Sequence, residues 1–190
     1  MLIFTKERNL DWFLVIGQST IKIIIMKKLL TLSIALAATG IMMAQNGKSI
    51  PSIKVKTLDG KTIDISQLKN NGKPIVISFW ATWCKPCKAE LNTIAEDYED
   101  WVDETGVELI AVSIDDARST GRVEPYVNSQ SWEYTVLLDP NGDLKRAMNV
   151  NNVPHTFLVD GSTGKIVWNH NNYSSGDEDE LLEQIEKIAK

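Results

Sequence analysis

Residues Ile75–Cys87 read IVISFWATWCKPC, and this stretch decides the fold. Its first part, Ile75–Trp80, is almost continuously apolar and β-prone, which is typical of a strand buried on both faces of a sheet. Pro86 suits the first turn of a helix, where its missing N–H leaves no hydrogen bond unmade. The stretch therefore predicts a buried strand, a turn and a helix, with Cys84 just before the helix and Cys87 inside its first turn.

Cys84 and Cys87 are the only cysteines of the chain, and two residues separate them. A disulfide across so short a loop adds little stability, so the pair indicates redox chemistry and not a structural link. Unpaired N–H groups and the dipole at a helix start favour a thiolate at Cys84, and the thiolate is the species that attacks disulfides. We expect Cys84 to form a mixed disulfide with a substrate, and Cys87 to attack Cys84 and release the substrate.

A Cys-x-x-Cys pair can also form half of a metal site. The two histidines, His155 and His170, lie far along the chain and not at zinc-finger spacing. We therefore assign no metal ligands, and a thiolate module that binds copper or zinc remains the alternative function. A third possibility is a binding module that keeps only the fold, and the retention of both cysteines disfavours it.

The remaining sequence alternates between segments typical of strands and of helices. Strands are expected at 53–57, 62–65, 107–114, 134–138, 155–160 and 165–169, and helices at 86–105, 122–131, 144–148 and after Gly176. Asp59-Gly60 between the first two strands indicates a hairpin, and the last two strands form another. Alternation followed by a hairpin predicts an α/β fold, with a mixed central sheet and helices on both faces.

The N-terminal residues read as a targeting segment. Met26–Lys28 is a basic start, and the mostly apolar run 29–44 that follows is shorter than the ~20 residues that span a membrane. We interpret 26–44 as a signal peptide and 45–190 as one domain. Residues 1–25 read as an upstream extension from a mis-called start, with a genuine, unusual leader as the alternative. An uncleaved membrane anchor is the alternative. Export to the periplasm would place the cysteines where disulfides form.

The charge balance disfavours one class of partner. The chain holds 25 acidic and 20 basic residues, a net charge of −5. A negative field repels a phosphate backbone, so we expect no nucleic-acid partner.

Three stretches carry a resemblance to a known family. FWATWCKPC (79–87) resembles the active-site motif of the thioredoxin superfamily, and CKAEL (87–91) resembles its exported TlpA/ResA-like branch. VPHTFLVD (153–160) is similar to the second motif of that superfamily, a proline that opens a strand. The resemblance covers residues 49–190 and implies a thioredoxin-like three-layer sandwich with an extra N-terminal β-hairpin.

The resemblance also implies site residues. Pro154 would be cis and would lie beside the cysteines, with the Val153 backbone placed to pair with a substrate strand. Glu90 matches a family carboxylate that would share a helix face with Cys87 and, half buried, relay its protons; a solvated glutamate is the alternative. His155 would either tune the thiols or lie partly exposed at the strand start. The remaining implied substrate-contact residues are Trp83 and Pro86, and Ser78 replaces the buried aspartate of thioredoxins proper.

The implied activity is thiol–disulfide exchange with cysteines of exported proteins. The resemblance favours the reductase direction, including apocytochromes that await haem, in cytochrome c maturation. It implies a redox-active Cys84–Cys87 disulfide in place of any cofactor, a membrane electron donor, and a monomer. The direction of electron flow depends on the reduction potential of the pair.

Overall fold

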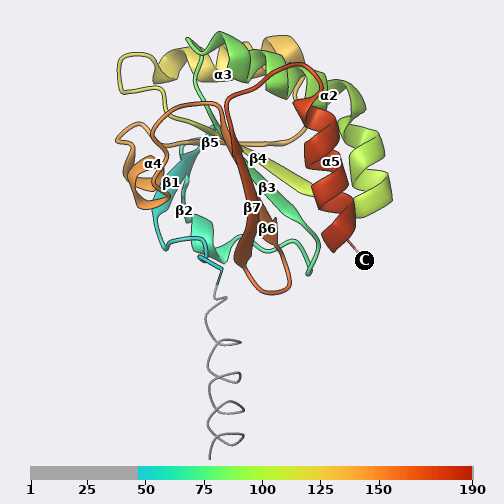
Figure 1. Cartoon of the computed structure of the whole chain (residues 1–190). Helices are drawn as coiled ribbons and strands as arrows, with labels where there is room; N and C mark the ends of the chain where they lie inside the picture. The colour runs from blue at the N-terminus through green and yellow to red at the C-terminus, as the bar shows by residue number, and fades with distance from the viewer. Residues whose placement is uncertain (1–46, 190) are drawn as a thin grey trace, which may run out of the picture. The chain divides into compact units, whose positions relative to one another are not determined.

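The computed structural model describes residues 47–189, drawn in colour in Figure 1. The predicted upstream extension at 1–25 and the signal peptide or anchor at 26–44 lie outside the described residues. Within the part of the chain that the structure describes, no helix is both long and apolar enough to cross a bilayer.

Seven strands form one mixed sheet in the order β2-β1-β5-β4-β3-β6-β7, which confirms the predicted sheet. Strands β3, β4 and β5 run parallel to one another. Next to β3 lies β6, which is antiparallel to it, and β7 is antiparallel to β6. Next to β5 lies β1, which is antiparallel to it and forms an antiparallel hairpin with β2. The expected extra N-terminal hairpin is therefore present. The strands are β1 (Lys54–Thr57), β2 (Thr62–Asp64), β3 (Ile75–Trp80), β4 (Glu108–Ser113), β5 (Thr135–Leu138), β6 (His155–Asp160) and β7 (Lys165–Asn171).

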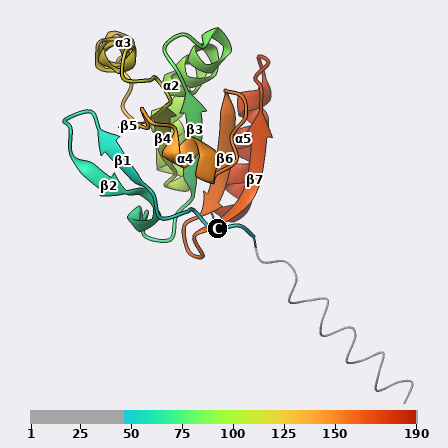
Figure 2. The same cartoon turned by 90° about the vertical axis from the view of Figure 1, so that its left-hand side faces the viewer.

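Helices cover both faces of the sheet, as Figure 2 shows for α4 on one side and α2 and α5 on the other. Side chains alternate along β3, so that Val76 and Trp80 enter one core while Ile77 and Phe79 enter the other. The thioredoxin-like three-layer arrangement is thus confirmed. The helices are α2 (Lys85–Thr105), α3 (Val123–Gln130), α4 (Asp143–Ala147) and α5 (Asp177–Ile188), with 3₁₀ turns η1 (Ile65–Gln67) and η2 (Thr120–Arg122).

Helix α2 begins and ends where its sequence predicts. Its apolar stripe buries Leu91, Ile94 and Trp101. Gly106 ends the helix with φ of 69°, and its N–H bonds the carbonyl of Val102. Val102 itself, expected on the stripe, is 37 % exposed. The stripe is therefore narrower at the last turn than the spacing suggests.

Strand β7 is two residues longer than predicted. It continues to Asn171 because its pairing with β6 extends to the first residue of that strand, His155. Directly after β6, Gly161 passes so close to the loop before β3 that a Cβ atom would lie 1.9 Å from the carbonyl oxygen of Lys73. Only glycine fits this crossing without displacing backbone.

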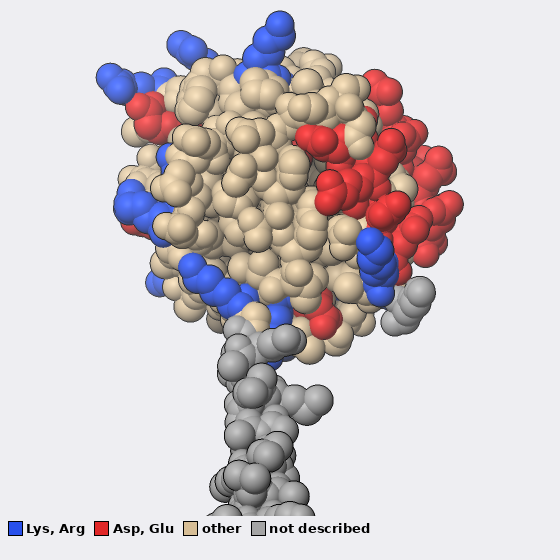
Figure 3. All heavy atoms as spheres, in the orientation of Figure 1, with Lys and Arg blue, Asp and Glu red and all other residues tan. Residues whose placement is uncertain are grey.

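Acidic side chains gather on one side of the surface, over α2 and α5, as Figure 3 shows in red. The first turn of α5 holds four acidic residues in a row, Asp177–Glu180. Negative charge is favourable at a helix N-terminus, so this turn suits its place in the fold.

Candidate active site

A disulfide joins Cys84 and Cys87 at the start of α2, where the sequence analysis places the pair. Cys84 is the N-cap residue, and its Sγ accepts a hydrogen bond from the Cys87 backbone N–H at 3.3 Å. Cys84 is 5 % exposed, whereas Cys87 is completely buried. Cys84 is therefore the more exposed of the two cysteines.

The loop before β6 lies against this disulfide. The Val153–Pro154 peptide bond is cis, as the resemblance implied. The Val153 carbonyl oxygen lies 3.8 Å from Cys84 Sγ. Residues about seventy positions apart in the chain thus meet at one edge of the sheet, because β3 and β6 are neighbours.

Two tryptophans lie near the cysteines: Trp83 directly precedes Cys84, and Trp80 belongs to the same buried cluster as both cysteines. Trp83 is 64 % exposed directly before Cys84, and Pro86 is exposed in the first turn of α2. Trp80 is fully buried, and its ring packs against Trp132 at 4.8 Å and against Tyr126 at 5.7 Å. Trp83 and Pro86 therefore form open surface beside the cysteines, while Trp80 belongs to the core beneath them.

Glu90 is buried, which excludes the alternative of a solvated helix glutamate. It is 4 % exposed, so the expectation of a half-buried carboxylate was also wrong, because the side chain points inward to Thr156 of β6. Its Oε1 accepts a hydrogen bond from Thr156 Oγ1 at 2.8 Å, and the same hydroxyl lies 3.0 Å from Ser78 Oγ. The alignment of Ser78 with Thr156 in neighbouring strands places this contact.

Burial raises the pKa of Glu90 from its ordinary 4.5 to about 7. The nearby carboxylates of Asp177 and Glu178 raise this pKa further, and the hydrogen bond from Thr156 opposes the shift. A carboxyl group that changes protonation near neutral pH, three residues after Cys87 on one helix face, is suited to exchange protons with that cysteine. Such shifted groups concentrate at functional sites.

His155 does not share this environment. Its ring stacks on Phe157 at 4.3 Å, and its Nε2 lies 3.3 Å from Asn169 Oδ1. Alternation along β6 directs it to the sheet face opposite that of Thr156. Partial burial lowers its pKa. These contacts correspond to the alternative of a partly exposed histidine at the start of a strand.

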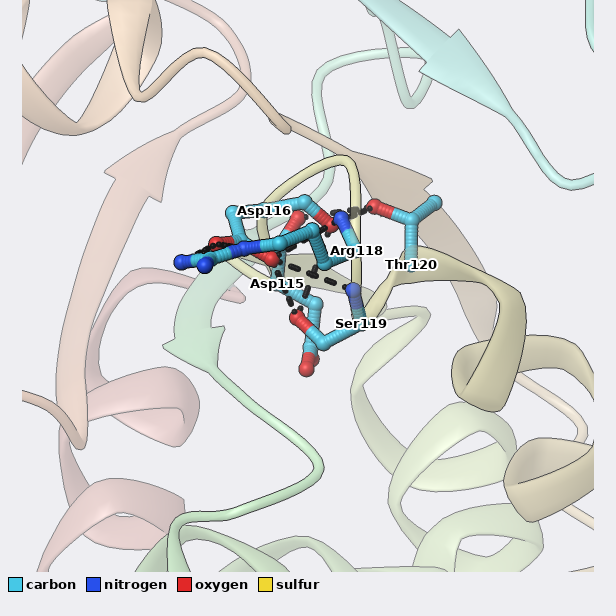
Figure 4. Close-up of polar contacts among 5 residues, drawn as sticks. All are labelled: Asp115, Asp116, Arg118, Ser119 and Thr120. Carbon is cyan, nitrogen blue, oxygen red and sulfur yellow. Dashed lines mark hydrogen bonds and ion pairs between the residues drawn. The ribbon is translucent and has the colours of Figure 1, made fainter.

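Asp115, which the sequence analysis did not single out, supports the active-site turn. It is 1 % exposed, and its carboxylate accepts hydrogen bonds from the Thr82 N–H at 2.8 Å, the Thr82 hydroxyl at 2.6 Å and the Ser113 hydroxyl at 2.9 Å. Its carbonyl accepts from the Thr120 hydroxyl. Figure 4 shows the loop after β4 that holds Asp115. An acidic residue directly after a buried strand is the signal that could have identified it.

Residues 47–189 contain no group of three or more His, Cys, Asp or Glu side chains arranged to hold a metal ion. This finding gives the copper or zinc alternative no support.

A Cys-x-x-Cys disulfide at a helix start, beside a cis-proline loop on a three-layer α/β fold, defines a thioredoxin-like thiol–disulfide oxidoreductase. The family model described as the AhpC/TSA family matches residues 46–169, and the chain belongs to that family.

Named relatives agree with this class. The chain is 36 % identical over 123 residues to thiol-disulfide oxidoreductase ResA of Bacillus anthracis, which covers 65 % of this chain and 68 % of the relative. A thioredoxin-like protein from Porphyromonas gingivalis is 51 % identical, with a TM-score of 0.67 over 74 % of this chain and 91 % of its own. A protein assigned as thiol:disulfide interchange protein DsbE from Chlorobium tepidum is 26 % identical. Its structure matches with a TM-score of 0.66 over 76 % of this chain and 97 % of its own chain.

Proposed function

We propose that this chain reduces disulfides in exported proteins, with Cys84 as the attacking residue and Cys87 as the resolving one. The observation that carries this assignment is the difference between the two sulfurs. Cys84 retains some exposure and caps α2, where the helix dipole and the Cys87 N–H favour its thiolate once the disulfide is reduced. Cys87 is enclosed and can reach only a sulfur already attached at Cys84.

The reaction runs in two exchanges. The Cys84 thiolate attacks a substrate disulfide, a mixed disulfide forms, and one substrate sulfur leaves as a thiolate. Cys87 then gives its proton to the Glu90 carboxylate and attacks Cys84 Sγ, which releases the second substrate thiolate. The product is the Cys84–Cys87 disulfide seen in the structure. This pair serves as the redox centre without a separate cofactor.

The substrate would bind across the exposed surface around Cys84. Trp83 and Pro86 would contact it from the α2 side, and the Val153 backbone beside Pro154 would pair with its extended chain. We assign His155 a peripheral place, because its ring lies against Phe157.

The cellular setting is part of the proposal. The name ResA among the relatives, together with the basic and apolar segment at 26–44, supports an exported, periplasmic reductase that is recharged by a membrane electron donor. The substrates we favour are apocytochrome cysteines that await haem. We propose that the protein acts on them as a monomer.

Insulin reduction tests the assignment. Purified protein with dithiothreitol should accelerate insulin precipitation, and Cys84→Ser should abolish the acceleration. Cys87→Ser is the matched control, because it should still attack and should accumulate a mixed disulfide with the substrate. Full activity in Cys84→Ser would refute the assigned roles. A measured reduction potential as oxidising as that of a disulfide donor would refute the reductase direction.

A further inference from the structure

Three polar side chains lie side by side on the sheet face that α2 and α5 cover. Ser78 of β3 pairs with Thr156 of β6, and Thr156 pairs with His170 of β7. Residues directly opposite in antiparallel strands share a face and place their Cβ atoms about 5 Å apart. A polar row therefore crosses this otherwise apolar layer from the sheet interior to its β7 edge.

Two buried atoms beside this row lack an aligned hydrogen bond to any described residue. They are Glu90 Oε2 and His170 Nε2, and the one further such atom in residues 47–189 is Trp80 Nε1. Thr156 lies between the first two, bonded to Glu90 through its hydroxyl and paired with His170 in the sheet. An unsatisfied buried polar atom costs about 1–3 kcal/mol, so the unpartnered Glu90 Oε2 beside this row indicates a function.

The outer end of the row reaches solvent. His170 Nε2 lies 3.3 Å from Asp177 Oδ2, at ion-pair distance, and the two side chains are 29 % and 31 % exposed. Asp177 Oδ2 also accepts a hydrogen bond from the Ser174 N–H at 2.7 Å, which fixes the carboxylate. The His170 ring lies parallel to that of Trp168, at 5.8 Å. The His170 imidazole is thus held by Asp177 at the partly exposed end of the row, next to the residue that bonds Glu90.

We propose that His170 and Asp177 are positioning residues that carry the proton of Glu90 to and from solvent during thiol–disulfide exchange. This inference rests on the proposed function. When Cys87 attacks the mixed disulfide, its proton passes to the Glu90 carboxylate, the new S–S bond forms, and the substrate sulfur leaves with the electron pair. In the disulfide form, Glu90 keeps this proton below its pKa of about 7 and must release it to solvent above that pH. The His170 imidazole, oriented by Asp177, accepts the proton and releases it to water.

Other groups near Glu90 are less suited to this task. The pKa of Tyr173 is raised by burial, so its phenol stays protonated at neutral pH, whereas an imidazole accepts and releases protons there. Glu178 acts on Glu90 through its charge. Thr156 contacts Glu90 directly, and its neighbours in the sheet are Ser78, bonded to the same hydroxyl, and His170, paired with it across β6 and β7. The charged and titratable groups around Glu90 are Asp177 and Glu178 from α5, Tyr173 from the loop after β7, and Cys87 three residues before it on α2.

A charge-matched pair of variants of the full-length chain tests the coupling. Asp177→Asn removes the carboxylate beside His170, and Asp179→Asn removes an exposed one in the same turn. The Glu90 carboxyl is followed by carbon-13 NMR across pH in the disulfide form. Asp177→Asn should move its titration to lower pH by about 0.5–1 unit, because a neighbouring negative charge is lost. Asp179→Asn should leave it in place. No movement with Asp177→Asn, or equal movement with both, overturns the proposal.

The kinetic test uses His170→Gln. At low buffer concentration, the rate of thiol–disulfide exchange between this variant and a small disulfide should fall by up to about tenfold. This loss is smaller than the full contribution of proton transfer to catalysis, because only the route to solvent is changed. Added imidazole should restore the rate, which a structural defect would not allow. Wild-type rates without imidazole, or a slow rate that imidazole leaves unchanged, overturn the proposal. A wild-type chain that fails to reduce insulin refutes the proposed function, whereas an active wild type with an unaffected His170→Gln refutes only the proton route.

Discussion

Glu90→Gln should make the protein more stable than wild type at high pH and change its pH dependence. In the folded state the pKa of Glu90 is about 7, against an ordinary 4.5. A raised pKa means that the folded state binds this proton more tightly than the unfolded state. Its contribution to stability is therefore fully present below pH 4.5 and is lost as pH rises through 7. The difference corresponds to roughly 3 kcal/mol of unfolding free energy between pH 4.5 and 8.

Urea unfolding of the oxidised protein at several pH values measures this effect. The free energy of unfolding of wild type should fall relative to that of Glu90→Gln as pH rises, since glutamine carries no proton to lose. Glu96→Gln, which changes an exposed glutamate of the same helix, is the control and should follow wild type. Wild-type and Glu90→Gln curves that stay parallel within about 0.5 kcal/mol would show that burial does not hold the Glu90 proton, and the relay would lose its basis.

Two further predictions concern contacts that position the site and close the fold. Thr82→Val should lower the free energy of unfolding by about 1.5–3 kcal/mol, because the buried Asp115 carboxylate loses a hydroxyl donor. Thr82→Ser keeps that donor and should retain most of the stability. Equal losses of unfolding free energy in the two variants, measured by urea titration, would contradict this prediction. Gly161→Ala should cost about 2–4 kcal/mol, because its Cβ would collide with the Lys73 carbonyl, whereas Gly121→Ala meets open space and should be nearly neutral in thermal melts.

Local patterns predicted most of the elements and the cysteine pair. The run Ile75–Trp80 is apolar at nearly every position because both faces of β3 are covered, so it reads as a central strand without any other information. Cys84 and Pro86 mark the helix start through rules that act within one turn. Family resemblance supplied the cis bond before Pro154, which no local pattern requires.

The remaining site features depend on strand order, which local patterns do not encode. Thr156 bonds Glu90 only because β6 inserts beside β3, and Asp115 reaches Thr82 only because β4 lies on the other side of β3. Both residues come from segments remote in the chain from the cysteines. Likewise, the register of β6 decides which face of the sheet His155 occupies. A shift of one residue would turn its side chain from the face where it packs on Phe157 to the opposite face.

The packing of Trp80 beneath the active-site helix gives the protein a built-in optical signal. Trp80 belongs to the same buried cluster as Cys84 and Cys87, and Trp132 lies against its ring. Disulfides quench excited indoles by accepting an electron, whereas free thiols do so less effectively. Opening the Cys84–Cys87 bond should therefore brighten the intrinsic fluorescence, so that electron flow through this chain can be followed in real time without a dye or an added partner.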